Sequence, residues 1–314
     1  MERLIPLNIG NGPHVLLTGA NGFVASHILS ILLDSGFAVT ATLRSQSKAD
    51  DIIKTHPSWK GKFALKDIQK EMIEPAVMGT TEILKSAHKH GGKSLKRFVL
   101  LGRLESNDTN PGQVTAQQAI DQKDNVLGYN VSKTKAEQTA WEFVKTNGPS
   151  FDLTVINPDI ITGPMIHPIS GPGSINATNQ FAVASFIDGT RETIEDVRFP
   201  FYHFVDVRDV AQSHVDALTN PAAGGQRILL ISGLITPQLV ANTVRKSFPT
   251  LRDKVPEGKP SQILPEGVHP TGWDMSLGLD ILFAGTKRGQ WKYIELEQSV
   301  TDAVHSMIDQ NVLE

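Results

Sequence analysis

The sequence lacks cysteine, has only 6% aromatic residues and contains no long apolar run. Without a thiol the chain can form neither a disulfide nor a thiolate metal site, and it has no cysteine nucleophile. Its apolar runs are far shorter than the roughly 20 residues that span a membrane, so we expect no membrane association. The formal charge of -3 provides no basic surface for nucleic acid. The N-terminal residues have no secretory signal pattern, and we expect a cytoplasmic protein.

The rest of the composition is that of a folded globular chain. Apolar residues make up 39% and charged residues 20% of the 314 residues, as in ordinary globular domains. This length suffices for one large α/β domain or for two smaller ones. The sequence has no internal repeat and no low-complexity tract, so we expect neither a repeat architecture nor extensive disorder.

The first 43 residues predict a strand, a glycine turn, a helix and a second strand. Residues 14–17 are mostly apolar, and the turn after them has the spacing Gly19, Gly22, Ala25. Apolar residues then recur at helical spacing until Gly36, and residues 38–43 form an apolar strand. Glycine lets a backbone approach a pyrophosphate, and the helix N-terminus offers free N–H groups. A tight turn without a ligand is the alternative, but the flanking elements favour dinucleotide binding.

The end of the second strand indicates which nicotinamide cofactor is bound. An NAD site usually has an acidic residue there that holds the ribose 2′-hydroxyl, and residues 38–47 contain no acid. The strand ends instead at Arg44, and Lys48 follows four residues later. A guanidinium matches the geometry of a phosphate, and a lysine adds a second positive charge. The pattern therefore favours NADP(H) over the alternative of two solvated surface cations.

Tyr129 and Lys133 form the predicted catalytic pair. They are four residues apart at the start of a helical pattern, so they lie on one face of that helix. The chain has three tyrosines, and neither Tyr202 nor Tyr293 is followed by lysine at this spacing. A neighbouring ammonium group favours the phenolate form of tyrosine. Such a phenol can donate its proton to a carbonyl oxygen as hydride arrives at the carbon.

Several blocks of the sequence together resemble the extended short-chain dehydrogenase/reductase family, in its dihydroflavonol 4-reductase-like branch, which includes fungal and yeast carbonyl reductases. The blocks are TGANGFVASHI (18–28), ATLRSQSK (41–48), EPAVMGTTEILKSA (74–87), KRFVLL (96–101), YNVSKTKAEQTAWEF (129–143), VINPDIITGP (155–164) and FVDVRDVAQSH (204–214). The resemblance implies an α/β fold with a Rossmann-like, doubly wound parallel sheet. It places an NADP-binding domain at residues 1–160 and a smaller, partly interwoven α/β substrate lobe at residues 161–314.

The resemblance also implies roles for individual residues. Arg44 and Lys48 would take the 2′-phosphate, Tyr129 would be the general acid, and Lys133 would support it and hold the nicotinamide ribose. The pyrophosphate would lie along Gly19, Ala20, Asn21, Gly22, Phe23 and Val24. Adenine would contact Asp67 and Ile68, Ile161 would line the nicotinamide pocket, and Thr178 would contact the cofactor in a looser alignment. We expect no metal, and we read the cluster Asp206, Arg208 and Asp209 as structural.

The chain departs from this family after Ile68. The family has a helix and a fourth strand here, but only six residues separate Ile68 from Pro75. A parallel crossover needs at least about 10–12 residues for its helix and loops before a strand is added. One helix–strand unit must therefore be missing. The sheet must either close up, so that its first and fifth strands become adjacent, or be strongly destabilised.

A second departure affects the catalytic serine. The family follows the strand at 97–100 with Thr-Ser-Ser, whose hydroxyl binds the substrate carbonyl, whereas this chain has Gly102 and Arg103 there, and Ser106 comes too late. Losing one such donor costs roughly 10²–10³ in rate. Arg103 can replace the serine only through a different geometry. A misread exon boundary and a genuinely degenerate protein both explain the two departures.

Three functions follow from these observations. The first is an NADPH-dependent ketone or aldehyde reductase acting on a small carbonyl substrate, in the manner of fungal family members that act in polyketide-like secondary metabolism. The second is a non-catalytic relative that keeps part of the cofactor site, which the missing unit and serine favour. The third is a nucleotide-sugar epimerase or dehydratase, against which Arg44 and Lys48 argue. Binding of NADPH to the purified chain would separate the first two.

Overall fold

The computed structural model describes residues 12–43, 45–67, 76–104, 125–189, 192–194, 203–264, 266–267, 269, 272–282 and 292–313. The first sheet has the order β1-β2-β3 and is parallel throughout. Its elements are β1 (His14–Thr18), α1 (Phe23–Asp34), β2 (Ala38–Leu43), α2 (Gln46–Thr55) and β3 (Phe63–Asp67). The strand–turn–helix–strand prediction for the first 43 residues is therefore confirmed.

The second sheet, with the order β4-β5-β8, is also parallel. Its strands are β4 (Arg97–Leu101), β5 (Asp152–Pro158) and β8 (Arg227–Leu230). The helices α3 (Ala76–Gly91) and α5 (Asn125–Asn147) pack against each other, and α5 also packs on β5. Between them and the sheet lies an apolar cluster of Leu84, Ala140, Phe151, Leu153 and Val155.

The third sheet is short and mixed. It contains β6 (Ile160–Thr162), β7 (His203–Asp206) and β9 (Gly233–Leu234), in which β6 and β7 are parallel and β7 and β9 antiparallel. Around it lie α6 (Ala177–Ala182), α8 (Pro237–Ser247) and α10 (Leu296–Asp309), whereas α9 (Ser276–Leu282) packs on β8. The alternation of parallel β and α units with this smaller C-terminal part is the α/β, Rossmann-like architecture predicted from the sequence.

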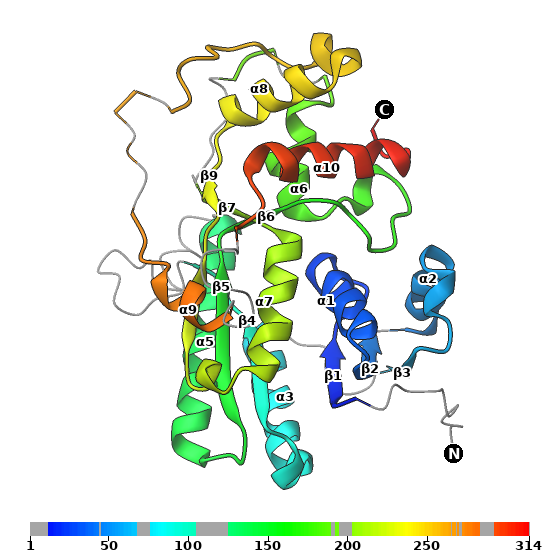
Figure 1. The fold of residues 1–314 in the computed structure, drawn as a ribbon, viewed down its shortest axis with the longest axis vertical. Coiled ribbons are helices and arrows are strands. Elements are labelled where there is room, and N and C mark those ends of the chain that lie inside the picture. Colours follow the sequence, from blue (N-terminus) through cyan, green and yellow to red (C-terminus); the bar gives the residue numbers. More distant parts are fainter. Residues whose placement is uncertain are drawn as a thin grey trace.

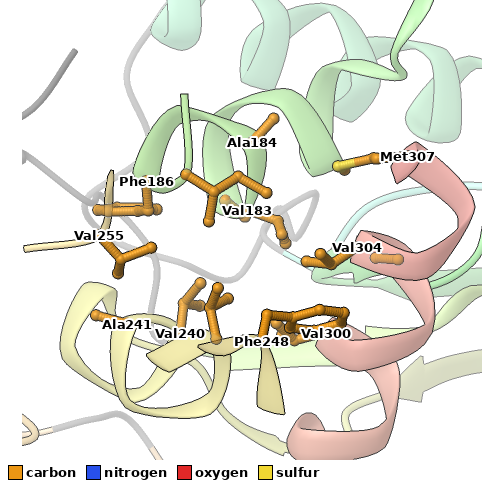
Figure 2. Packing of buried hydrophobic residues seen from close by; sticks show 14 of the residues in the cluster. Val183, Ala184, Phe186, Val240, Ala241, Phe248, Val255, Val300, Val304 and Met307 are labelled. Carbon is orange, nitrogen blue, oxygen red and sulfur yellow. The ribbon is translucent and has the colours of Figure 1, made fainter. Parts of the chain in front are cut away.

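The C-terminal part has an apolar core of its own. Thr236 begins α8 by accepting a hydrogen bond from the Leu239 backbone N–H at 3.1 Å. The helix then buries Val240, Ala241 and Val244, which recur at helical spacing, against α10. Figure 2 shows the α8 side chains labelled Val240 and Ala241 in one cluster with those of the green segment, labelled Val183, Ala184 and Phe186, and of α10, labelled Val300, Val304 and Met307. Each large apolar side chain buried in this way contributes about 1.5–3 kcal/mol.

Helix α7 (Val207–Thr219) packs between helix α1 of the first sheet and the strands of the second sheet. It packs against α1 and also against β4 and β5, and Figure 1 shows it standing between α1 and the second sheet. Its Ala211 and Val215 belong to the cluster that includes Leu29 of α1. Its Val210 and Ala217 belong to the cluster that includes Ile156 of β5. One amphipathic helix thus provides apolar contacts to both sheets.

The predicted loss of a central strand agrees with the observed pairing. Among the described strands, β1 pairs with β2 alone and β4 with β5 alone, so the first and second sheets have not closed into one. Alternate residues of β1 point to opposite faces of the sheet. Val15 and Leu17 pack on the α1 cluster, whereas Leu16, on the other face, is 58% exposed. Among the described residues, this face of β1 therefore lacks the cover that a parallel strand usually has.

Candidate active site

The glycine turn after β1 has the backbone that a phosphate site needs. Gly19 has φ of 64°, a conformation that side-chain-bearing residues rarely adopt, and its N–H donates to the Thr42 carbonyl at 3.1 Å. The Gly22 N–H donates to the Gly19 carbonyl at 2.9 Å, and α1 begins at the next residue. No side chain caps α1, and the space beside the Gly19 α-carbon is open. The free N–H groups of the first turn therefore remain available to an anion.

The predicted 2′-phosphate site lies directly after β2. Lys48 is in the first turn of α2, where its ammonium group is half exposed and 3.6 Å from the Asp51 carboxylate. A surface pair of this kind contributes little stability, so the lysine can turn to another anion at small cost. Arg44 lies outside the described residues. In the sheet register Asp67 is the partner of Leu43, which places its backbone beside the end of β2, whereas Ile68 is outside the described residues.

Tyr129 and Lys133 both lie in α5, as predicted from their spacing. The Lys133 ammonium group donates to the carbonyl of Leu101, the last residue of β4, at 3.0 Å. Burial lowers the pKa of Lys133, and the positive charge of Arg103 lowers it further, while Glu137 acts in the opposite direction. Tyr129, one turn earlier, is 53% exposed. The helix therefore holds a partly buried cation at the carboxyl end of β4 and, one turn earlier, a solvent-accessible phenol.

The position of the family's serine is occupied differently here. A β-carbon at Gly102 would overlap the side-chain oxygen of Asn157, so that no side chain fits directly after β4. The next residue, Arg103, is half-buried and places its guanidinium carbon 5.6 Å from the centroid of the Tyr129 ring. This is within the range of a cation–π contact. Ser106 lies outside the described residues. The stacking of Arg103 on Tyr129 was not predicted from the sequence.

A buried ion pair supports α5 beneath this site. The Glu137 carboxylate is almost fully buried, and it accepts hydrogen bonds from Arg227 of β8 at 2.8 Å and from the indole N–H of Trp141 at 3.2 Å. Arg227 also reaches the Leu104 carbonyl at 3.4 Å. The pair ties α5, β8 and the segment after β4 together. The sequence offered no signal for it, because 90 residues separate the two partners.

The remaining predicted cofactor residues, Ile161 and Thr178, form a hydrogen bond with each other beside an apolar cluster. The Thr178 hydroxyl donates to the Ile161 carbonyl at 2.6 Å, which joins two residues predicted separately. Ile161 packs on the same apolar cluster as Val24, from the glycine turn, and Leu101, which accepts the Lys133 hydrogen bond. Residues from the beginning of α1, the end of β4 and β6 therefore surround one cluster. Of these, β4 belongs to the second sheet and β6 to the third, and α1 follows β1 of the first sheet.

The acidic cluster of α7 is structural, as predicted. Asp206 accepts a hydrogen bond from the Arg208 backbone N–H at 2.8 Å at the start of α7, and the Arg208 guanidinium joins Asp206 to Asp302 of α10. Asp209 accepts from the Ile294 backbone N–H at 2.8 Å, and burial raises the pKa of Asp209 to about 7. The described part of the chain holds no group of three His, Asp or Glu side chains arranged for a metal ion.

Comparisons with known proteins give relatives over most of the chain. An oxidoreductase of Schizosaccharomyces pombe is 33% identical, with 79% of this chain and 86% of that protein covered. The ketoreductase azaE of Aspergillus niger is 28% identical, with 94% and 98% covered. The structure of Gre2 from Candida albicans in complex with NADPH superposes with a TM-score of 0.76 at 26% identity, covering 95% of this chain and 99% of that one. No protein-family model matches the chain.

The length of the alignment with azaE bears on the missing helix–strand unit. The match with azaE extends over 344 aligned positions, which exceeds the 314 residues of this chain, so that relative has residues at many positions where this chain has none. This agrees with the missing helix–strand unit.

Among the helices of the described ranges, none combines the length and the apolar character needed to cross a bilayer.

Proposed function

Because the chain belongs to the extended short-chain dehydrogenase/reductase family, in the branch of the dihydroflavonol 4-reductase-like and fungal carbonyl reductases, we propose that it is an NADPH-dependent reductase of a ketone or aldehyde. The observation that carries the proposal is the hydrogen bond of the Lys133 ammonium group to the end of β4, with Tyr129 one helical turn away. In this proposal Tyr129 is the proton donor and Lys133 is the cation that supports it, at the carboxyl end of β4.

The residues present fit an NADP(H) cofactor. The uncapped start of α1 and the open space beside Gly19 suit a pyrophosphate, for which we propose contacts from residues 19–24. Arg44 and Lys48 would hold the 2′-phosphate, in a strand end that lacks an acid. Asp67 and Ile68 would contact the adenine, and Ile161 and Thr178 would lie along the nicotinamide side. When bound, the cofactor supplies a hydride to the substrate carbonyl carbon.

The chain's own residues then handle the proton. The Tyr129 phenol donates its proton to the carbonyl oxygen as the carbon takes up hydride. The Arg103 guanidinium lies beside the ring of this phenol, with its carbon 5.6 Å from the ring centroid. The hydrogen bond of the Lys133 ammonium group to the Leu101 carbonyl, in a partly buried position, restrains this side chain.

The similarity to the ketoreductase azaE of Aspergillus niger supports a more specific role. We place the reaction in the cytoplasm, on a small carbonyl compound of a polyketide-like secondary-metabolite pathway. We further propose residues 1–160 as the cofactor domain and residues 161–314 as the substrate lobe, interwoven through β8 and α7. Nucleotide-sugar epimerisation remains the less favoured alternative, because it requires no 2′-phosphate recognition.

A second candidate is a cofactor-binding protein without turnover. It is favoured by the edges of β1 and β4 that no other described strand pairs with, and by Gly102 and Arg103 in place of the serine. Fluorescence titration with NADPH, followed by NADPH oxidation with a panel of ketones and aldehydes, separates the two. Binding together with oxidation supports the reductase. Binding without oxidation of any carbonyl supports the second candidate, and absence of binding would contradict both.

Tyr129→Phe tests the assignment of the proton donor. The substitution keeps the ring over which Arg103 stacks and removes only the hydroxyl. We expect NADPH affinity to change by less than about threefold and turnover to fall by at least the 10²–10⁴ that a positioned acid supplies. Turnover within tenfold of the unmodified chain would show that another group donates the proton.

A further inference from the structure

Residues 163–166, directly after β6, lie between the first sheet and the C-terminal part of the molecule. Figure 1 shows the green chain in this region running between α10 and the helices α1 and α2. Met165 belongs to the apolar cluster of the C-terminal part, whereas the next residue, Ile166, packs on the cluster of the first sheet. Two consecutive side chains thus join two apolar cores. We call residues 163–166 the strap.

All four backbone carbonyls of the strap accept hydrogen bonds from side chains of other elements. The pairs, donor first, are Asn179 to Gly163 at 2.8 Å, His27 to Pro164 at 2.9 Å, Gln310 to Met165 at 2.7 Å and His56 to Ile166 at 2.6 Å. Helix α6 and the end of α10 therefore hold the strap from one side, and α1 and the end of α2 hold it from the other. Because each carbonyl has its own partner, the path of the strap is fixed.

His56, which directly follows α2, is the donor best held in place. Its imidazole stacks on Trp59, with ring centroids 3.8 Å apart and an interplanar angle of 16°. Trp59 is itself buried in the apolar cluster of the first sheet. Since the Ile166 carbonyl can only accept, the Nε2 atom of His56 carries the hydrogen. His56 therefore ties the end of α2 to the end of the strap.

The strap begins at the residues proposed for the nicotinamide side of the cofactor. Helix α6 binds on both sides of this point, because Thr178 donates to the Ile161 carbonyl and the next residue, Asn179, donates to the Gly163 carbonyl. The proposed phosphate contacts are at the beginnings of α1 and α2, the helices whose side the strap contacts through His27 and His56. The strap thus connects the two parts of the proposed cofactor site.

We infer that the strap fixes the nicotinamide-side residues relative to the phosphate-binding helices, and that His56 is a positioning residue for hydride transfer; this inference rests on the proposed reductase function. A ligand held at both ends binds well only where the distance between the two sites matches its own length. If the strap moves, the phosphate sites of α1 and α2 remain intact, but the nicotinamide side is displaced. A displacement of about 1 Å can lower a reaction rate roughly a hundredfold.

Two ligands of different length test the inference. 2′,5′-ADP carries the adenosine and the 2′-phosphate without a nicotinamide, whereas NADPH carries all three. For His56→Ala we expect the affinity for 2′,5′-ADP to change by less than about twofold and that for NADPH to fall roughly three- to tenfold, the range of one net hydrogen bond. With a ketone substrate, kcat should fall roughly ten- to a hundredfold. His56→Gln, whose amide can still donate to the Ile166 carbonyl, should recover much of both losses.

His14→Ala is the matched control. His14 is at the amino end of β1, where its Nε2 is hydrogen-bonded to the Thr40 hydroxyl at 2.8 Å, so this variant also removes an imidazole and its hydrogen bond from the first sheet. Both affinities and kcat should stay within about twofold. Equal losses of NADPH and 2′,5′-ADP affinity in His56→Ala, or an unchanged NADPH affinity and kcat, would overturn the inference. A loss in His14→Ala equal to that in His56→Ala would also overturn it.

Hydrogen–deuterium exchange separates the inference from the proposed function, since it needs no ligand. In His56→Ala the amides of residues 160–167 should exchange faster, while those of β1 remain unchanged. This result in a chain that binds neither NADPH nor 2′,5′-ADP supports the strap, and only the reductase proposal fails. Unchanged exchange of residues 160–167 in a chain that binds and oxidises NADPH refutes the strap and leaves the reductase.

Discussion

Leu16, in the middle of β1, offers a direct test of the missing central strand. In a complete parallel sheet covered on both faces, this side chain would be part of the core. Here it is 58% exposed, whereas Leu29 in the neighbouring helix α1 is fully buried. Substituting each leucine by alanine therefore compares the same chemical change at two positions of one structural unit.

The burial of the two side chains sets the expected magnitudes. Full burial of a leucine is worth about 1.5–3 kcal/mol, and Leu16 has less than half of that burial, so Leu16→Ala should cost about 1 kcal/mol or less. Leu29→Ala removes a fully buried side chain and leaves a cavity, which costs about 2–5 kcal/mol. We expect the Leu29 variant to be destabilised by at least about 1 kcal/mol more than the Leu16 variant.

Urea unfolding followed by circular dichroism and tryptophan fluorescence measures this difference. Trp59 is buried in the same apolar cluster as Leu29, so its emission reports on the first sheet. The two variants should show a clearly lower midpoint for Leu29→Ala and nearly the original midpoint for Leu16→Ala. A loss for Leu16→Ala as large as that for Leu29→Ala would mean that β1 is covered in solution, and the inferred gap in the sheet would be wrong.

Two further predictions concern stability. Burial raises the pKa of Asp209 from its ordinary 3.8 to about 7, so the folded chain retains a proton that the unfolded chain releases, and stability falls as the pH rises from about 4 to 7. Asp209→Asn should therefore raise the urea midpoint relative to the unmodified chain at pH 8 but not at pH 4. Equal changes of the midpoint at the two pH values would contradict the raised pKa of Asp209. Gly102→Ala should lower the thermal midpoint by the equivalent of about 1–3 kcal/mol, because its β-carbon would overlap the Asn157 side chain. Adding Asn157→Ala should restore part of that loss, and failure to do so would place the cause elsewhere.

The local elements of this protein follow from its sequence. The first strand, the glycine turn and helix α1 could be predicted because their signals are short-range, namely apolar periodicity and the spacing of Gly19 and Gly22. The placement of Tyr129 and Lys133 on one helix follows from their spacing for the same reason. The loss of a helix–strand unit could be predicted because six residues after Ile68 are too few to form it, whatever the remaining chain does.

Only the tertiary structure decided what surrounds these elements. The contact of Lys133 with Leu101 joins residues 32 apart, and the ion pair of Glu137 with Arg227 joins residues 90 apart. Such contacts depend on strand register and helix packing, which no local pattern encodes. The same holds for α7, which packs against α1 on the first sheet and against β4 and β5 of the second, while no described strand pairs the two sheets. The absence of a strand was thus determined by the length of one segment, whereas the way in which the two sheets are still connected was determined by packing.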